Sequence, residues 1–153
     1  MYADNPRIYC VYEVCQKHRI PVILMAGGNA GPDLSYSMPV HLDRVAADFP
    51  ELILIAAHGC WPWVSEGLGV AFRRKNVFMS PDMYMINLPG ASEYAAAACG
   101  FLQDQFIFAT AYPMVGLSDA IEYINRLPAS DDVKKKLLYE NAARILGLSG
   151  GSQ

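Results

Sequence analysis

The 153-residue sequence contains no apolar run long enough to cross a membrane and no long block of one charge. The longest apolar runs have the length of strands, so no transmembrane helix is expected. The N-terminus has neither a basic region nor an apolar core, which predicts the absence of a signal peptide and a cytoplasmic location. The strongest basic run, Arg73 to Lys75, is explained by a solvated turn. Neither nucleic acid nor a membrane is therefore an expected partner.

Paired cysteines are also missing. The four cysteines stand at positions 10, 15, 60 and 99, and no two of them form a C-x-x-C motif. Zinc ribbons and thioredoxin-like redox sites need such pairs, so neither class has support. Hydrophobic residues, in contrast, make up 53% of the chain and charged residues 18%. This composition supplies a buried core and leaves apolar residues for a surface that meets a partner.

Four apolar runs of strand length recur along the chain. They cover residues 21–26, 52–57, 76–79 and 106–110. Hydrophobic and polar residues do not alternate within these runs, which predicts strands covered on both faces, as in a parallel sheet.

Helical patterns, with apolar residues three and four positions apart, separate and follow the four runs. We expect helices near residues 8–15, 42–49, 64–72, 94–102, 117–124 and 131–146. Ser130 is the expected N-cap of the last helix, and Gly147 is its expected end. Residues 1–148 then form one domain, and the small polar residues 149–153 are expected to be a disordered tail.

The alternation of strands and helices predicts an α/β fold with a parallel sheet. Four strands cannot close a barrel of ordinary shear and tilt. Two architectures therefore remain, an open doubly wound sheet or half of a TIM-type (β/α)8 barrel. In both of them the functional groups collect beyond the carboxyl ends of the strands.

Several candidate residues follow the predicted strands. His58 directly follows the second run and precedes a glycine, which suits an acid–base group or a ligand, although a histidine bonded to nearby backbone explains it equally well. Asp82 follows the third run and could replace a missing carboxylate, but Ser-Pro-Asp is ordinary turn chemistry, and a turn is the preferred interpretation. The residues predicted to line a substrate pocket are Met25, Trp61, Asp82, Tyr84, Ala111 and Tyr112. The aromatic residues Trp61, Trp63, Tyr84 and Tyr112 could line a pocket for an aromatic acid, and at least two of these four are expected in the core or an interface.

The glycine-rich segment Gly27–Gly31 follows the first run. Its backbone N–H groups could bind an anion. It lacks the Lys-Ser/Thr ending of a P-loop and does not match G-x-G-x-x-G, so a flexible loop is the preferred interpretation.

Three segments carry a resemblance to a known family: Leu52–Gly59 followed by Trp61-Pro62-Trp63, the turn Ala111-Tyr112-Pro113, and Tyr139–Leu148. They resemble the sixth strand, the eighth strand and the C-terminal helix of the amidohydrolase-related family. This family includes aminocarboxymuconate semialdehyde decarboxylase and γ-resorcylate decarboxylase. The resemblance implies the C-terminal half of a TIM-type barrel, with the four runs equivalent to strands five to eight.

Family members that use a metal bind a divalent ion, commonly zinc. The ligands are a His-x-His pair on strand one, a His on strand five, a His on strand six and an Asp on strand eight. The resemblance places His58 at the strand-six position, Met25 at the strand-five position and Ala111 at the strand-eight position, and strand one has no counterpart. It therefore implies an incomplete site in which His58 is a vestigial ligand, and no cofactor is expected.

Three functional hypotheses remain. The first is a truncated or degenerate hydrolase or decarboxylase that acts on small carboxylated substrates, with His58 as its catalytic residue. The second is a non-catalytic half-barrel that serves as an assembly or binding module. The third is a flavodoxin-like anion binder that uses Gly27–Gly31. A half-barrel exposes two sheet edges, so we expect a homodimer or larger homo-oligomer, which would place two copies of His58 across one mouth.

Overall fold

The computed structural model describes residues 1–148, and its centre is a three-stranded parallel sheet. The strands are β1 (Val22–Met25), β2 (Leu54–Ala57) and β3 (Val77–Ser80), in the order β1-β2-β3. The register aligns Met25, Ala57 and Ser80 in one row across the sheet. Because the pairing is parallel, all three strands end at the same edge, and the loops that follow them lie close together.

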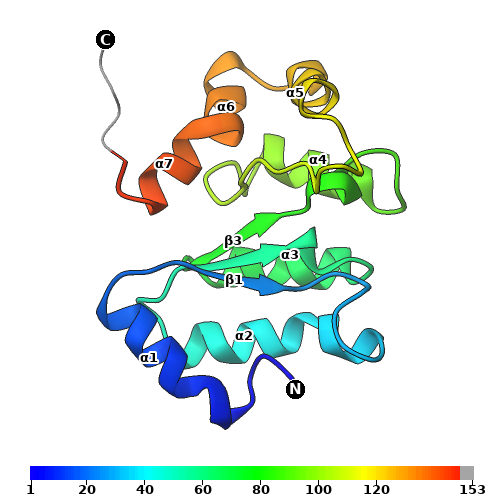
Figure 1. Ribbon diagram of the computed structural model, residues 1–153. Helices are drawn as coiled ribbons and strands as arrows, with labels where there is room; N and C mark the ends of the chain where they lie inside the picture. Colours follow the sequence, from blue (N-terminus) through cyan, green and yellow to red (C-terminus); the bar gives the residue numbers. More distant parts are fainter. Residues whose placement is uncertain (149–153) are drawn as a thin grey trace.

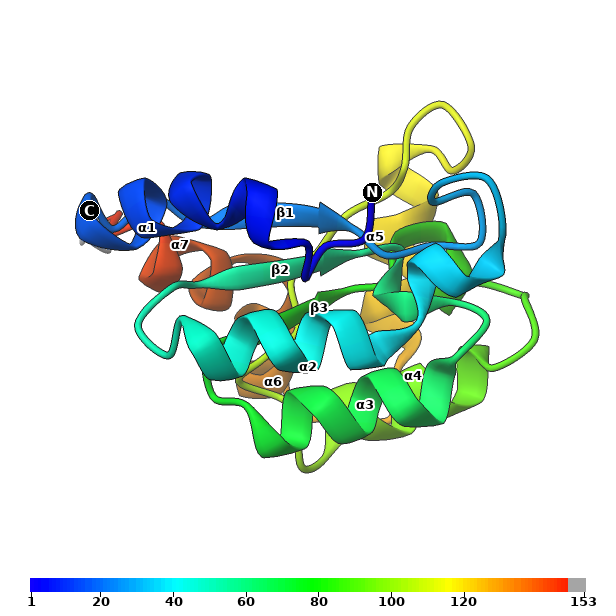
Figure 2. The ribbon, with the colours of Figure 1, turned by 90° about the horizontal axis from the view of Figure 1, so that it is seen from below.

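Seven α-helices accompany the sheet in the described part of the chain. They are α1 (Tyr9–Lys17), α2 (Pro39–Asp48), α3 (Val64–Arg73), α4 (Ala91–Cys99), α5 (Leu117–Arg126), α6 (Asp131–Lys135) and α7 (Asn141–Ile145). Figure 1 shows α2 below the sheet, α3 behind it and α4 to α7 above it. Figure 2, seen from below, shows α2 and α3 side by side on the same face of the sheet. The two helices that connect the three strands, α2 and α3, therefore lie on one face, as they do in a β/α barrel.

Only one face of β1 is covered, which corrects the prediction that both faces of every strand are buried. Ile23 and Met25 are 68% and 51% exposed. The alternate residues Val22 and Leu24 pack against the core. At the far side of the sheet, in contrast, Phe78 is only 4% exposed, with the Arg144 guanidinium 5.8 Å from the centre of its ring. Within residues 1–148 no equivalent element lies over β1.

The predicted fourth strand, residues 106–110, is not formed as a strand. Met79 and Phe106 pair in an isolated parallel bridge. Met79 N–H donates to the Gln105 carbonyl at 2.7 Å, and Ile107 N–H donates to the Met79 carbonyl at 2.9 Å. A strand requires a continued ladder, and these two bonds make only one bridge with β3. The apolar composition correctly predicted that this segment lies beside β3, but the prediction of a full strand was wrong.

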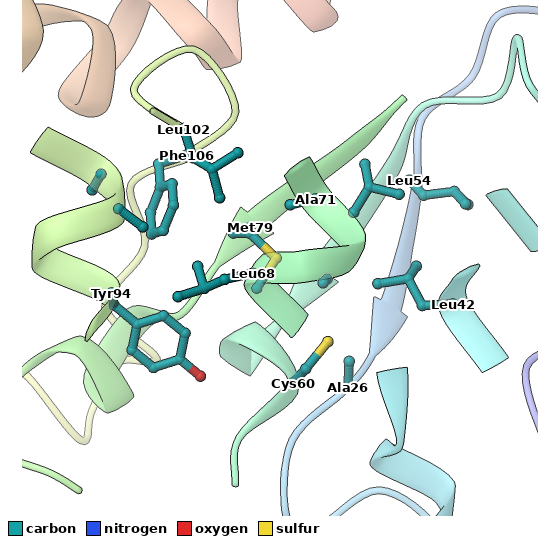
Figure 3. Close-up of a cluster of buried hydrophobic side chains, with 14 of the residues drawn as sticks. Ala26, Leu42, Leu54, Cys60, Leu68, Ala71, Met79, Tyr94, Leu102 and Phe106 are labelled. Carbon is teal, nitrogen blue, oxygen red and sulfur yellow. The ribbon is translucent and has the colours of Figure 1, made fainter. Parts of the chain in front are cut away.

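The core lies between the helix-covered face of the sheet and the helices. Leu54 and Met79 are fully buried and point toward α3, which contributes Leu68 and Ala71. Figure 3 shows this cluster, which extends to Tyr94 of α4 and also includes Ala26, Leu42, Cys60, Leu102 and Phe106. Burial of such apolar side chains is the main favourable contribution to folding.

Buried side-chain amides connect successive strand–helix units. The Asn76 amide, just before β3, donates to the carbonyls of Ala46, Phe49 and Leu52 at 3.0–3.2 Å. The Gln105 amide repeats the arrangement one unit later. It donates to Ala71, Arg74 and Val77 at 2.7–3.0 Å. Each amide bonds carbonyls at the end of a helix and near the start of a strand, where helix-end carbonyls lack an intrahelical donor.

The last predicted helix is interrupted. Residues 131–146 form α6, a π-helical turn over Lys136–Glu140 and then α7. The Ser130 hydroxyl accepts a hydrogen bond from Val133 N–H at 3.4 Å, as its predicted role as N-cap requires. Gly147 has a φ of 66°, which suits the predicted end of the helix. The predicted disordered tail, residues 149–153, lies outside the described residues. No helix of the described part is long and apolar enough to span a membrane.

Replacing Asn76 with Ala removes one hydrogen bond from each of three carbonyls, and among the described residues only the Phe49 carbonyl keeps another donor, the Leu52 N–H. We expect Asn76→Ala to lower the free energy of unfolding by about 2–3 kcal/mol, measured by urea denaturation. Asn125 is exposed on α5, so Asn125→Ala is the matched control and should change stability by less than about 0.5 kcal/mol. Equal effects of the two substitutions would contradict a structural role for the Asn76 amide.

Candidate functional site

Among the residues beyond the carboxyl ends of the strands, three that the sequence singled out have a left-handed backbone. The φ angles are 64° at His58, 45° at Asp82 and 51° at Ala111. This conformation costs roughly 1–2 kcal/mol for a residue with a Cβ atom. Strained residues of this kind cluster at functional sites. The edge of the sheet where these three residues lie is therefore the candidate site.

The structure brings His58 and Asp82 together. His58 Nδ1 lies 2.7 Å from Asp82 Oδ2, and the side chains are 23% and 5% exposed. The distance is that of an ion pair when His58 is protonated, and His58 Nδ1 has no hydrogen-bond partner among the described residues. Asp82 Oδ1 is buried and has no hydrogen-bond partner among the described residues. Asp82 is therefore a partner of His58, and turn chemistry alone, the preferred interpretation of the sequence, does not describe its role.

Burial also affects the ionisation of Asp82. Removal from water raises the pKa of Asp82 above its ordinary value, because the charged carboxylate loses hydration. The positive charge of a protonated His58 acts in the opposite direction, and its effect is the smaller one.

Aromatic side chains form one wall of the site. The Tyr84 ring lies edge-on to the His58 imidazole, with 5.6 Å between the ring centres. Trp61 stacks on Tyr84 at 5.0 Å, and its indole N–H donates to the Pro89 carbonyl at 3.1 Å. Tyr84 is only 6% exposed. Trp61 and Tyr84, both predicted pocket residues, therefore lie beside the His58–Asp82 pair.

The glycine-rich segment forms a second wall. A Cβ atom at Gly27 would lie 2.5 Å from the His58 Cβ, and one at Gly28 would lie 2.9 Å from the Trp61 ring. These glycines are needed for close packing, a role that the interpretation of the segment as a plain flexible loop did not include. Sequence reasoning also missed Tyr94, whose hydroxyl donates to the Gly59 carbonyl at 2.9 Å and supports the turn that carries His58.

The remaining predicted residues lie apart from the pair. Met25 is 51% exposed on the open face of β1. Tyr112 is 78% exposed, and its backbone N–H donates to Thr110 Oγ1 at 3.1 Å. Ala111 is partly buried and carries no polar group. The structure thus unites four of the seven predicted site residues, His58, Trp61, Asp82 and Tyr84.

These residues do not fit a resident divalent metal ion. Within residues 1–148 no group of three or more His, Cys, Asp or Glu side chains could hold one. His58 is the one imidazole of the cluster, and its Nδ1 faces Asp82. Met25 offers a soft thioether and Ala111 a methyl group, neither of which suits a hard divalent ion.

The arrangement does suit proton transfer. A carboxylate beside one nitrogen of an imidazole orients the ring and stabilises its protonated form. The other nitrogen, Nε2, is then available to donate a hydrogen bond or a proton to a bound molecule. The partial exposure of the His58 side chain permits such contact.

A sequence profile of the Amidohydrolase family matches residues 1–148. The chain belongs to the amidohydrolase family, as the three resembling segments predicted.

Solved structures agree on the fold. An uncharacterized TIM-barrel protein from Bordetella bronchiseptica is 49% identical, with a TM-score of 0.91 over 98% of this chain and 53% of that chain. A dihydroxybenzoic acid decarboxylase from a Polaromonas species, solved with bound manganese and 2-nitroresorcinol, is 17% identical, with a TM-score of 0.71 over 97% of this chain and 56% of that chain. A 4-oxalomesaconate hydratase from Rhodopseudomonas palustris is 18% identical, with a TM-score of 0.67 over 97% of this chain and 52% of that chain.

The fold is therefore TIM-barrel-like, and the chain spans about half the length of these solved relatives. No protein of curated function matches it.

The raised pKa of Asp82 predicts a pH dependence of stability. Because the folded state holds this proton to a higher pH than the unfolded chain does, stability decreases as the pH rises from the ordinary pKa of 3.8 through the raised value. Asp82→Asn removes the ionisation, so we expect a flatter profile of unfolding free energy against pH, measured by urea denaturation.

The exposed Asp119 provides a matched control. Asp119→Asn should leave the shape of the profile unchanged. A profile that is just as steep in Asp82→Asn as in the parent protein would show that other groups cause the dependence.

Proposed function

We propose that this chain is the half of an amidohydrolase-type barrel that corresponds to strands five to eight. Its His58–Asp82 pair binds a small carboxylated molecule and transfers a proton to it without a resident metal. The short contact between His58 and Asp82 at the carboxyl edge of the sheet is the observation that carries this proposal.

The chemistry of the walls favours a carboxylated aromatic molecule. A protonated imidazole donates a charge-assisted hydrogen bond to a carboxylate, which is stronger than a neutral one. Trp61 is partly exposed and offers ring surface on which an aromatic molecule can stack, and the buried Tyr84 supports Trp61 from behind. The decarboxylase from the Polaromonas species is named for a substrate of this class, dihydroxybenzoic acid.

The corresponding reaction is decarboxylation. The bond between the ring carbon and the carboxyl carbon breaks, carbon dioxide leaves, and the ring carbon takes up a proton. His58 is placed to supply this proton through Nε2, and Asp82 holds the ring from the Nδ1 side. Hydrolysis of a carboxylated substrate would use the same pair as the base that activates water.

A non-catalytic binding module is the second candidate function. The exposed Met25 and the apolar Ala111 favour it, because neither side chain supplies a group for catalysis. In this case the carboxylated molecule binds beside His58 and leaves unchanged. Turnover distinguishes the two candidates.

The test uses 2,6-dihydroxybenzoate as the probe, with the purified chain treated with EDTA. We expect calorimetry to show binding and His58→Gln to weaken it about 10- to 100-fold, because one charge-assisted hydrogen bond contributes roughly 1.5–3 kcal/mol. Headspace analysis of carbon dioxide in the same samples measures turnover.

His18 is exposed at the end of α1, so His18→Gln is the matched control and should bind as the parent chain does. Binding without carbon dioxide release would support the binding module over the enzyme. Equal affinity of parent and His58→Gln chains, or no binding by either, would overturn the proposed site.

A further inference from the structure

The turn that carries His58 has a left-handed backbone at three successive residues. The φ angles are 64° at His58, 62° at Gly59 and 67° at Cys60. Glycine adopts this conformation readily, but a residue with a Cβ atom keeps it only where the surrounding structure holds it there. His58 and Cys60 are therefore strained, and contacts from other segments must maintain the turn.

Tyr94 of α4 makes a hydrogen bond to the middle of this turn. Its hydroxyl donates to the Gly59 carbonyl at 2.9 Å, and its side chain is fully buried. In Figure 3 the Tyr94 hydroxyl points toward the segment that carries Cys60. Burial raises the pKa of Tyr94, so the hydroxyl keeps its proton and remains a donor at neutral pH.

The accepting carbonyl belongs to the peptide unit between Gly59 and Cys60. Rotation of this unit would return the φ of Cys60 to the ordinary negative range and relieve its strain. It would also turn the carbonyl away from the Tyr94 hydroxyl, which costs a buried hydrogen bond. The Trp61 N–H donates to the His58 carbonyl at 3.1 Å and closes the turn across the same peptide unit, so the rotation would displace His58 as well.

Gly59 also joins the two turns of the site. A Cβ atom at Gly59 would lie 2.8 Å from Pro81 Cβ and 3.0 Å from Cε1 of the Tyr94 ring. Pro81 directly precedes Asp82, so the turn that carries His58 packs against the turn that carries its partner. The 2.7 Å contact between His58 Nδ1 and Asp82 Oδ2 therefore depends on where Gly59 is held.

We propose that Tyr94 is a positioning residue of the candidate site. Its hydroxyl fixes the turn His58–Cys60, and this turn directs the His58 imidazole at Asp82. Tyr94 does not touch a bound molecule, because its side chain is fully buried. The ligand-binding consequence of this role rests on the proposed function, whereas the position of the imidazole can be measured without a ligand.

NMR spectroscopy of the imidazole ring protons tests the proposal on the full, ligand-free chain. The chain contains three histidines, and His58→Gln identifies the signals of His58. Tyr94→Phe keeps the aromatic ring and removes only the hydroxyl. We expect it to shift the His58 signals and to weaken the nuclear Overhauser effect between the His58 and Tyr84 rings, whose centres lie 5.6 Å apart. The signals of His18 and His41 should not move.

Two control variants separate positioning from stability. Tyr139 is 54% exposed, so Tyr139→Phe removes a hydroxyl from the surface and should leave the His58 signals unchanged. Asn76→Ala weakens the fold at the opposite end of β3 and should also leave them unchanged. Circular dichroism establishes that each variant is folded. Unchanged His58 signals in Tyr94→Phe would overturn the proposal, and so would an equal shift in Asn76→Ala, because that shift indicates general loosening.

A measurement on the parent chain decides the question if Tyr94→Phe does not fold. A buried, hydrogen-bonded tyrosine hydroxyl exchanges its proton slowly with water, so the Tyr94 hydroxyl should give a proton signal of its own. Exchange as fast as that of the exposed Tyr139 hydroxyl would mean that the bond to Gly59 is absent, and the positioning role would fail.

Calorimetry with 2,6-dihydroxybenzoate gives the second readout. We expect Tyr94→Phe to weaken binding about three- to tenfold, less than His58→Gln does, because the imidazole remains but is no longer held in one orientation. Parent-like affinity in Tyr94→Phe would contradict the positioning role. Absence of binding by the parent chain would contradict the proposed function alone, and shifted His58 signals in Tyr94→Phe would then still support the role of Tyr94.

Discussion

Parallel pairing of β2 with β3 is the constraint on which the candidate site depends. It aligns Ala57 with Ser80, so the chain leaves both strands at one edge and carries His58 and Asp82 to within 2.7 Å of each other. The left-handed backbone at both residues shows that the turns have a strict geometry. A shift of the register by one residue would place the side chains on opposite faces and separate the pair.

A buried hydrogen-bonded amide recurs in successive strand–helix units, in addition to the apolar packing between them. Asn76 and Gln105 each precede a sheet segment, and each donates to three buried carbonyls of the preceding unit. Such contacts set the distance between a helix end and the next strand, which apolar packing alone leaves less specific. Rigid units, in turn, hold the loops that form the mouth, where Gly27 packs against His58.

Local signals in the sequence were sufficient for the elements and for one site residue. Periodic apolar residues located the helices, and Gly147 and Ser130 marked the ends of the last one. The failures have a common cause, which is dependence on distant partners. Residues 106–110 have the composition of a strand but form only one bridge with β3. Both faces of β1 were predicted to be buried, but one face is exposed. Asp82 looked like a turn residue because its partner is 24 positions away in the sequence.

The sequence by itself determined the class of fold, the family and the prominence of His58, because strand–helix alternation and short motifs are local properties of the chain. Only the tertiary structure decided which groups act together. It joined Asp82 to His58, stacked Trp61 on Tyr84, and left Met25 and Tyr112 outside the cluster. The physical reason is that burial and contact across strands arise from the packing of segments far apart in the chain, and no local pattern contains this information.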